Sequence, residues 1–314
     1  MAVSNLMSTM TPEVREHYSK QLLYVAQHWL RYTRYAKHST IPAGEGKVIN
    51  WRVFSRITVA SVPTALTEGT APAEGSLTVS NVAATAAQYG RWLGFSDQVS
   101  MLAIDPVLTE NNKLLGINAA ETLDVLARNV FAAGTTQRIA NGKTIGTLLA
   151  TDIINETDIK KIRRDLEKNL TPKFGDPETG YYIAIVSPDV YMDLLSLAGY
   201  QNTGYYSDPN RIYQGRVVDL YGIKFVCTTN SALYTGGVGS GSTLVGHVSV
   251  FFGMEAMGDV DVAKGQMEHI YHGLGSSGVN DPLNQQQSQG WKCFYTARIL
   301  NQNFLVTYVS TATL

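Results

Sequence analysis

The side chains best suited to chemistry lie in the run Glu268-His269-Ile270-Tyr271-His272, which holds two histidines and a carboxylate. On a strand, His269 and His272 point to opposite faces and cannot bind one ion together. On a helix they would be neighbours, but a zinc-protease motif needs histidines four residues apart with glutamate after the first. We therefore expect ordinary surface or loop histidines here, and no metal site.

A pair of carboxylates, Glu68 and Glu74, lies in a loop between two β-prone segments. Paired carboxylates near glycines are typical of general acid and base catalysis, so a hydrolase with a carboxylate site at Glu68 is one hypothesis. Neither glutamate has a histidine or lysine nearby in sequence to shift its pKa. We favour an ion pair between Glu68 and an arginine, on another subunit for example, and keep the hydrolase as the alternative.

Two further motifs fail on spacing. Gly142-Lys143-Thr144 resembles the end of a phosphate-binding loop, but Gln137 stands where the first glycine is needed. The run Gly275–Gly278 resembles a nucleophile elbow, but its closing glycine would fall at Val279. Asp259 and Asp261 would share a strand face and could bind a cation, although a solvated face is the simpler expectation. We therefore predict no catalytic residue, no cofactor and no metal.

Composition excludes some classes of function. The chain has 314 residues, 44% of them hydrophobic and 16% charged, with a formal net charge of −1. A dedicated nucleic-acid-binding protein would carry a basic surplus, so any DNA contact is expected to be non-specific. The cysteines Cys227 and Cys293 are expected to be reduced thiols. With no secretory signal and no long apolar run, we expect a cytoplasmic protein without a membrane span.

Before residue 47 the pattern indicates one amphipathic helix. Thr11-Pro12-Glu13 is a typical helix start, and Ile41-Pro42 ends the segment. Its apolar positions recur at spacings of three and four residues: Val14, Tyr18, Leu22, Val25, Trp29 and Tyr32. So much aromatic surface must pack on the helix's own domain or on another subunit.

Next comes a strand pair with little core of its own. The segment Lys47–Val59 and the segment Ser76–Tyr89 are β-prone, and a loop rich in proline, glycine and alanine joins them. Large apolar residues are few in the second segment, so two strands alone would be marginally stable. This pattern predicts an arm or flap that gains stability from its neighbours.

The remaining chain mixes helices and strands, which predicts an α+β fold. A long helix is expected from Asp105 to Ala133, about 40 Å at 1.5 Å per residue. The glycine-rich stretch Thr235–Ser242 is expected to be a flexible loop. The other expected elements are helices over Glu156–Asn169 and Val190–Leu197, and strands over Tyr181–Val186, Val217–Thr229, Thr243–Phe252 and Trp291–Val309.

Several short blocks in this order resemble one known family. They are YSKQLL (Tyr18–Leu23), IPAGEGKVINWRVFSR (Ile41–Arg56), LTEGTAP (Leu66–Pro72) with QYG (Gln88–Gly90), ETLDVLARNVFAAGT (Glu121–Thr135), DPLNQQQSQGWK (Asp281–Lys292) and ILNQNFLV (Ile299–Val306). Together they are similar to the major capsid proteins of tailed bacteriophages, in the subgroup named after the enquatro-type podophages.

This resemblance implies the Hong Kong 97-type capsid fold. Its parts would be an N-terminal arm (1–46), an extended loop (47–94), a peripheral domain with a spine helix (95–149), an axial domain (150–258) and C-terminal peripheral strands (259–314). The strand pair Trp291–Val309 would lie beside the spine helix. The loops Gly199–Gln214 and Thr235–Ser242 would make axial contacts.

The implied function is mechanical. Many copies would assemble as hexamers and pentamers into the icosahedral shell of a virion, formed in the host bacterial cytoplasm around double-stranded DNA. Implied partners are a portal protein, a separate scaffolding protein, since the arm starts almost at once, and a decoration or cement protein where one is present. No covalent crosslink is predicted. Expected intersubunit contacts, against intramolecular packing or plain surface charge as the simpler alternatives, are Trp29, Tyr32, Trp51, Arg52, Arg56 and Glu68.

Overall fold

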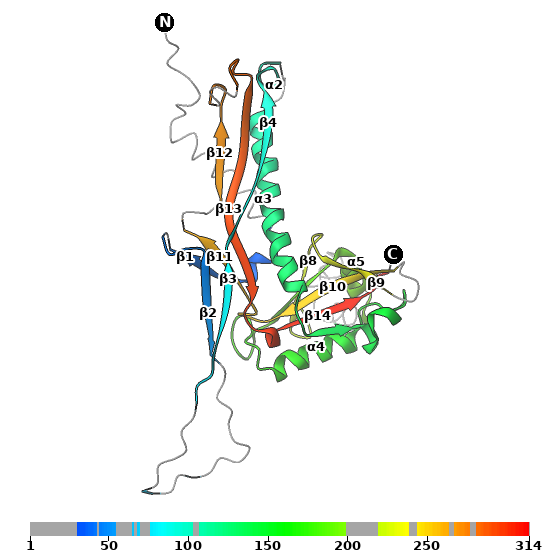
Figure 1. Cartoon of the computed structure of the whole chain (residues 1–314). Helices are drawn as coiled ribbons and strands as arrows, with labels where there is room; N and C mark the ends of the chain where they lie inside the picture. The colour runs from blue at the N-terminus through cyan, green and yellow to red at the C-terminus, as the bar shows by residue number, and fades with distance from the viewer. Residues whose placement is uncertain are drawn as a thin grey trace.

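The computed structural model describes residues 30–42, 44–54, 65, 68–69, 76–102, 107–198, 219–238, 244–263, 267–276 and 281–313. A slender part holds the long helix α3 and a five-stranded sheet, and a broader part holds a seven-stranded sheet (Figure 1). A two-stranded hairpin projects from the junction, away from the tip of the slender part (Figure 1). The predicted α+β class is confirmed. The N-terminal helix predicted from Thr11 lies outside the described residues up to residue 29.

Helix α3 spans Val107–Ala132 and is the axis of the slender part. The prediction of a long helix over Asp105–Ala133 is therefore confirmed to within two residues at each end. Small side chains at Ala119 and Ala127 are fully buried on its inner face, which lets β13 approach closely. Among the helices in the described ranges, none is both long and apolar enough to cross a membrane.

The five-stranded sheet lies along α3, with the 14-residue strand β13 at its centre. Trp291, Cys293 and Tyr295 of β13 are buried toward the helix, and alternate residues face outward. The strands of this sheet are β1 (Lys37–Ile41), β4 (Ala87–Ser96), β11 (Met257–Val262), β12 (Glu268–His272) and β13 (Gln286–Ile299). The short helix α2 (Asp97–Leu102) follows β4.

Two expectations for this region are wrong. The helix predicted from Thr11 does not continue to Ile41, because a short 3-10 turn at Thr33–Tyr35 leads into β1, which pairs in parallel with β11. The segment after Ala86 does not belong to the extended loop, because β4 pairs with β13 over ten residue pairs. A single residue, Ala86, separates β3 of the hairpin from β4 of the five-stranded sheet, so no turn signal marks the point where one ends and the other begins.

The seven-stranded sheet forms the centre of the broader part. Its path runs β5 (Gln137–Ile139), β14 (Leu305–Ser310), β10 (Leu244–Phe252), β6 (Tyr182–Val186), β8 (Ile223–Cys227) and β7 (Asp219–Leu220), with β9 (Ala232–Val238) also paired to β10. Every residue of β6 and β14 is buried, as in a sheet covered on both faces.

Two predictions about these strands are also corrected. Residues 305–310 do not run along the spine helix with β13. They form β14, whose residues are all buried and which pairs with β10 in the other sheet. Part of the glycine-rich stretch is a strand, since β9 continues to Val238 and pairs with β10. Glycines tolerate the close approach that this pairing requires.

Two helices of the broader part agree with the prediction, α4 at its start and α5 within two residues at each end. Asn155 caps α4 (Glu156–Lys168) by accepting a hydrogen bond from the Asp158 N–H. Ser187 caps α5 (Pro188–Leu195), which has proline at its start. The apolar face of α4, with Ile159, Ile162 and Leu166, is fully buried in the core of this part.

Candidate assembly surfaces

The hairpin of β2 (Val48–Phe54) and β3 (Val79–Thr85) exposes apolar side chains on both strands. Phe54 is 63% exposed and Val48 and Val79 are almost half exposed, and Leu77 just before β3 is exposed as well. Isolated two-stranded hairpins are marginal in water. The exposed residues thus form an apolar surface that the subunit itself does not cover.

Within the described part of the chain, the hairpin packs on the rest of the subunit at its base. Trp51 packs with Ile41, Ala86 and Val260, and its indole N–H donates to Ser39 Oγ at 3.2 Å. Arg52 lies on the opposite, exposed side of the strand. Of the two predicted contact residues on β2, Trp51 is therefore partly buried in its own subunit, whereas Arg52 is exposed.

Glu68 lies exposed on a turn beyond the hairpin strands, followed by Gly69 at φ +80°. Arg56 and Glu74 lie outside the described residues. An exposed carboxylate on a turn lacks the enclosed setting in which a catalytic acid meets its substrate. The geometry of Glu68 suits a contact with a cation on another subunit better than acid catalysis.

Tyr32 is not available for contact with another subunit. Its side chain is fully buried and packs on Phe131 of α3, with ring centroids 5.8 Å apart. The expectation of an intersubunit contact at Tyr32 is therefore wrong, and intramolecular packing explains its place in the apolar stripe. Trp29 lies outside the described residues.

A buried carboxylate on α3 joins three segments of the chain. Asp124 Oδ1 accepts the backbone N–H groups of Arg31 and Tyr32, each at 2.8 Å. Its Oδ2 accepts from Asn230 Nδ2 at 2.9 Å, and Asn230 Oδ1 accepts from Arg128 at 2.8 Å. This joint ties the end of the arm, the long helix and the turn between β8 and β9. Sequence reasoning missed it, because a single aspartate in a helix carries no signal of its partners.

A cluster of Ser187, His247 and Asp189 has the residue types of a hydrolase triad. Ser187 Oγ lies 3.0 Å from His247 Nδ1, and His247 Nε2 lies 3.8 Å from Asp189. However, Ser187 is buried and already accepts the Val190 N–H as the cap of α5. Burial lowers the pKa of His247, against the opposing effect of Asp189. The cluster fastens α5 to β10 and leaves no exposed nucleophile.

The histidines and aspartates considered for metal binding lie on two strands. His269 and His272 are on β12, as the strand alternative required, and do not share a face. Asp259 and Asp261 do share a face of β11, where His38 lies 3.3 Å from the first and 3.6 Å from the second. Burial raises the pKa of Asp259, and His38 opposes this shift. Among the described residues, no group of three such side chains is arranged to hold a metal ion.

The outer face of the five-stranded sheet carries an exposed tryptophan that sequence reasoning also missed. Trp92 of β4 is 71% exposed, and a side chain at Gly94 would come within 2.8 Å of its ring. Gly290 of β13 pairs with Trp92, so the surface beside the indole is flat. Hollows of about 460 and 520 Å³ flank the ring. Exposed aromatic residues of this kind are enriched in protein interfaces.

These features place the protein in the class of Hong Kong 97-like capsid proteins: a long spine helix beside an elongated sheet, a second domain around its own sheet, and a projecting hairpin. The model of the family "Phage capsid protein" matches residues 80–303, which is well over half of the chain. The chain belongs to this family and is a major capsid protein, a structural component of the phage head shell and not an enzyme.

Solved structures share the fold at low sequence identity. The capsid of Ralstonia phage GP4 is 12% identical with a TM-score of 0.69, covering 89% of this chain and 87% of that one. The cyanophage Pam1 capsid is 15% identical with a TM-score of 0.63, covering 99% of each chain. The mature capsid of bacteriophage PhiM1 is 15% identical with a TM-score of 0.62, covering 89% and 86%. Among curated protein sequences, none matches this chain.

Proposed function

We propose that the chain assembles as hexamers and pentamers into an icosahedral shell around double-stranded DNA, as a member of the enquatro-type podophage subgroup. The observation that carries this proposal is the hairpin β2–β3, whose apolar side chains lie exposed in the single subunit. Burying such surface between copies supplies a driving force for assembly.

The proposed domains follow the expected boundaries apart from two strands: β4 belongs to the peripheral sheet, and β14 belongs to the axial sheet. The arm covers residues 1–46 and the extended loop begins at residue 47, but it returns to the peripheral domain at Ala86 instead of residue 94. The axial domain spans residues 150–258 and also receives β14. Peripheral strands come from β4, β11, β12 and β13.

Contacts between copies are proposed for the arm through Trp29 and for the extended loop through Trp51, Arg52, Arg56 and Glu68. Support comes from the exposure of Arg52 and Glu68 and from the attachment of the hairpin at its base. Assembly would take place in the host bacterial cytoplasm. A scaffolding protein, a portal protein and, where one is present, a decoration or cement protein would be its partners.

The test is to express the chain with and without the scaffolding protein encoded by the same phage. Light scattering should show particles far larger than a subunit, and negative-stain images should show closed shells. A chain that stays monomeric with its scaffolding protein present would overturn the proposal. The hydrolase alternative is not carried forward, because the family is structural and Glu68 lies exposed on a turn.

A further inference from the structure

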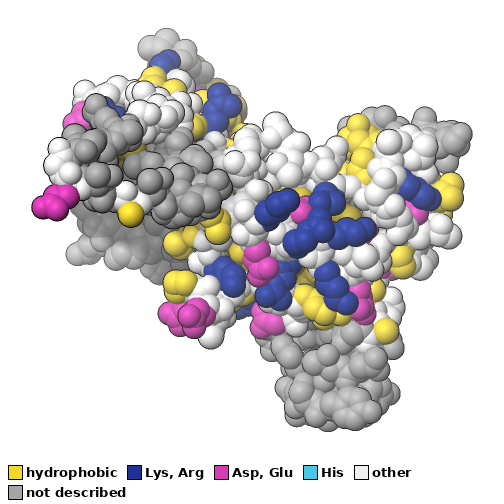
Figure 2. Space-filling view, turned by 90° about the horizontal axis from the view of Figure 1, so that it is seen from below, with side chains coloured by type: hydrophobic (Ala, Val, Ile, Leu, Met, Phe, Trp, Pro, Cys, Tyr) yellow, Lys and Arg dark blue, Asp and Glu magenta, His cyan; other side chains and the backbone are white. Residues whose placement is uncertain are grey.

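The outer side of α4 carries a group of lysine and arginine side chains. Figure 2 views the molecule from the side where Figure 1 draws α4, and Lys and Arg side chains gather across the middle of this face. We define the cationic face as Arg138, Lys143, Lys160, Lys161, Arg164 and Lys168. Four of these six residues belong to α4, and the other two precede it in the chain.

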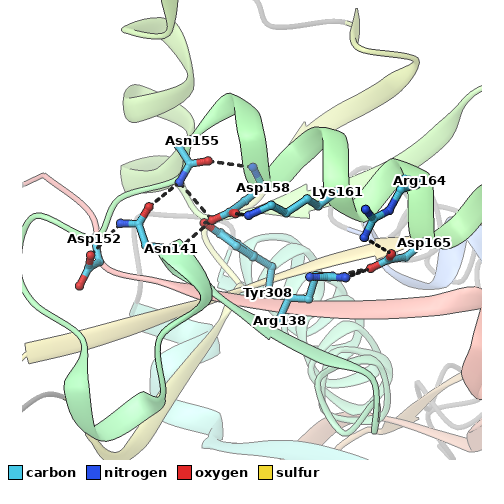
Figure 3. Close-up of polar contacts among 9 residues, drawn as sticks. All are labelled: Arg138, Asn141, Asp152, Asn155, Asp158, Lys161, Arg164, Asp165 and Tyr308. Carbon is cyan, nitrogen blue, oxygen red and sulfur yellow. Dashed lines mark hydrogen bonds and ion pairs between the residues drawn. The ribbon is translucent and has the colours of Figure 1, made fainter.

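The carboxylates that pair with this face lie beneath the cations. Lys161 is 42% exposed and its partner Asp158 is 6% exposed, and Lys143 is 32% exposed over Asp152 at 3%. Arg164 is 68% exposed and pairs with Asp165, which is 19% exposed and also binds Arg138. Figure 3 shows Asp158 and Asp165 of α4 pointing toward Tyr308 and Arg138, and Asp152 on the neighbouring loop.

Internal hydrogen bonds keep the carboxylates in this lower layer. Asp158 Oδ2 accepts the Asn141 N–H at 2.9 Å, the Asn155 amide at 3.1 Å and the Tyr308 hydroxyl at 3.2 Å (Figure 3). Asp152 accepts from Asn141 Nδ2 at 2.8 Å and from the Leu149 N–H at 2.7 Å. Because the negative ends are fixed inside, the positive ends face the solvent although most of the charges are paired.

Three lysine ion pairs on other elements lack this layering, as does the pair Arg163–Glu167 on α4, whose side chains are 41% and 42% exposed. Lys37 and Glu255 are each 48% exposed, and Lys113 and Glu110 are 42% and 56% exposed. The pair Lys292–Glu268 is likewise exposed on both sides. At those places an approaching anion meets a carboxylate as readily as an amine, so the pair presents no net positive surface.

We infer that the cationic face of α4 contacts the phosphate backbone of the enclosed DNA and therefore lines the interior of the shell. The inference rests on the proposed function, since it takes the shell to enclose DNA. Lysines and arginines held at a solvent-facing layer bind phosphate without reading sequence. Lys160, Arg164 and Lys168 follow one another at four-residue spacing along the helix, which forms a row suited to a polyanion.

The variant that tests the face is the triple change Lys160→Gln, Arg164→Gln and Lys168→Gln. It spares the folded network, because Asp165 keeps Arg138 and Glu156 keeps the hydroxyl of Tyr221. The matched control is Lys37→Gln, Lys113→Gln and Lys292→Gln, which removes the same charge from the evenly exposed pairs. Each full-length chain is titrated onto labelled duplex DNA while the salt concentration is raised.

We expect weak binding by the unmodified chain, with affinity falling as salt rises. Loss of three phosphate contacts would reduce the slope of log K against log salt by up to about 2.7. The control should keep the original slope. Equal losses in both variants, or no loss in either, would overturn the inference, as would binding to polyglutamate but not to duplex DNA, which would indicate an acidic protein partner.

The orientation is tested separately on assembled shells. A reconstruction of particle images should place α4 on the inner surface. Shells with α4 on the outer surface would overturn this inference and leave the proposed function intact. A chain that forms no shells with its scaffolding protein would instead contradict the proposed function, whatever the DNA titration shows.

Discussion

The seven-stranded sheet and the hairpin β2–β3 show opposite ways of using apolar residues. In the sheet, every residue of β6 and β14 is buried by the same subunit. In the hairpin, Phe54, Val48 and Val79 are exposed, and the base is packed. The first region therefore buries its apolar residues within the subunit, whereas the second leaves exposed the surface that we propose another copy covers.

The largest expected effect comes from the shared aromatic core. Phe252 of β10 is fully buried, with its ring 4.7 Å from Phe131 of α3. Phe252→Ala should lower the free energy of unfolding by about 3–5 kcal/mol because it leaves a cavity. Urea unfolding of the isolated subunit measures this change. A loss below about 1 kcal/mol would contradict the view that this region is self-sufficient.

The joint at Asp124 should have the next largest effect. Asp124→Ala leaves the N–H groups of Arg31 and Tyr32 and the amide of Asn230 without their acceptor, at a cost of about 2 kcal/mol or more. The control Glu121→Ala changes an exposed residue of the same helix and should stay within about 0.5 kcal/mol. If urea unfolding shows the same change in free energy for both variants, the Asp124 carboxylate does not hold these segments together.

A pH-dependent part of the stability should come from Asp152. Burial tends to raise its pKa, but hydrogen bonds from Lys143, Asn141 and the Leu149 N–H outweigh burial and lower it below the usual 3.8. A carboxyl whose pKa is lower in the folded state stabilises the protein above its ordinary pKa, and this contribution is lost as pH falls through the folded pKa.

The measurement compares unfolding of the natural chain and Asp152→Asn from about pH 7 down to about pH 3. At neutral pH the natural chain should be the more stable one. The difference should begin to shrink as the pH falls below the usual pKa of aspartate, because the unfolded chain then binds a proton that the folded carboxyl takes up only at a lower pH. A difference that does not change with pH would show that charge on Asp152 contributes nothing.

Elements with strong local signals were predictable from sequence. The long helix and α4 follow apolar periodicity and cap residues, and both agree with the structure within two residues. The start of β13 was harder to predict. Its buried positions Gln287 and Gln289 are polar, so the sequence there lacks the alternation of apolar and polar residues that indicates a strand. The sheet to which β14 belongs depends on pairing with β10, a long-range choice that no local pattern encodes.

The candidate surfaces were predictable only in part. Poverty in large apolar residues predicted a strand pair with little core of its own, and β2 and β3 do expose much of their apolar surface, but the pattern gave no sign that the chain joins the long sheet after Ala86. An apolar stripe does not show whether its residues pack within their own subunit or on another one, and Tyr32 proved to be buried in its own subunit. The exposure of Trp92 was not predictable, since it depends on Gly290, which strand pairing brings beside it from β13, as well as on Gly94 of its own strand.

The hairpin itself should behave in the opposite way to the core. The double change Phe54→Ser and Val79→Ser alters a cross-strand pair that is exposed in the subunit, so unfolding should shift by less than about 0.5 kcal/mol. Shell formation should nevertheless fall strongly, as light scattering would show. The control Leu283→Ser changes an exposed leucine far from the hairpin. Unimpaired assembly of the hairpin variant would show that these residues are not covered by another copy.

Glu68→Ala should have the smallest effect on the isolated subunit, because its side chain lies exposed on a turn and its loss opens no cavity. In the shell, the change would remove one side of an ion pair with a cation of a neighbouring copy, worth up to about 1 kcal/mol where it stays solvated. Because this small contribution is repeated at every copy, shells should form less completely and should dissociate at a lower denaturant concentration.

Glu68→Gln separates charge from shape, since glutamine keeps the size and hydrogen bonding of the side chain. If Gln and Ala weaken the shell equally, the charge of Glu68 makes the contact; if Gln behaves like the natural residue, the contact is a neutral hydrogen bond; and if neither changes the shell, Glu68 belongs to the part of the hairpin that no neighbour touches.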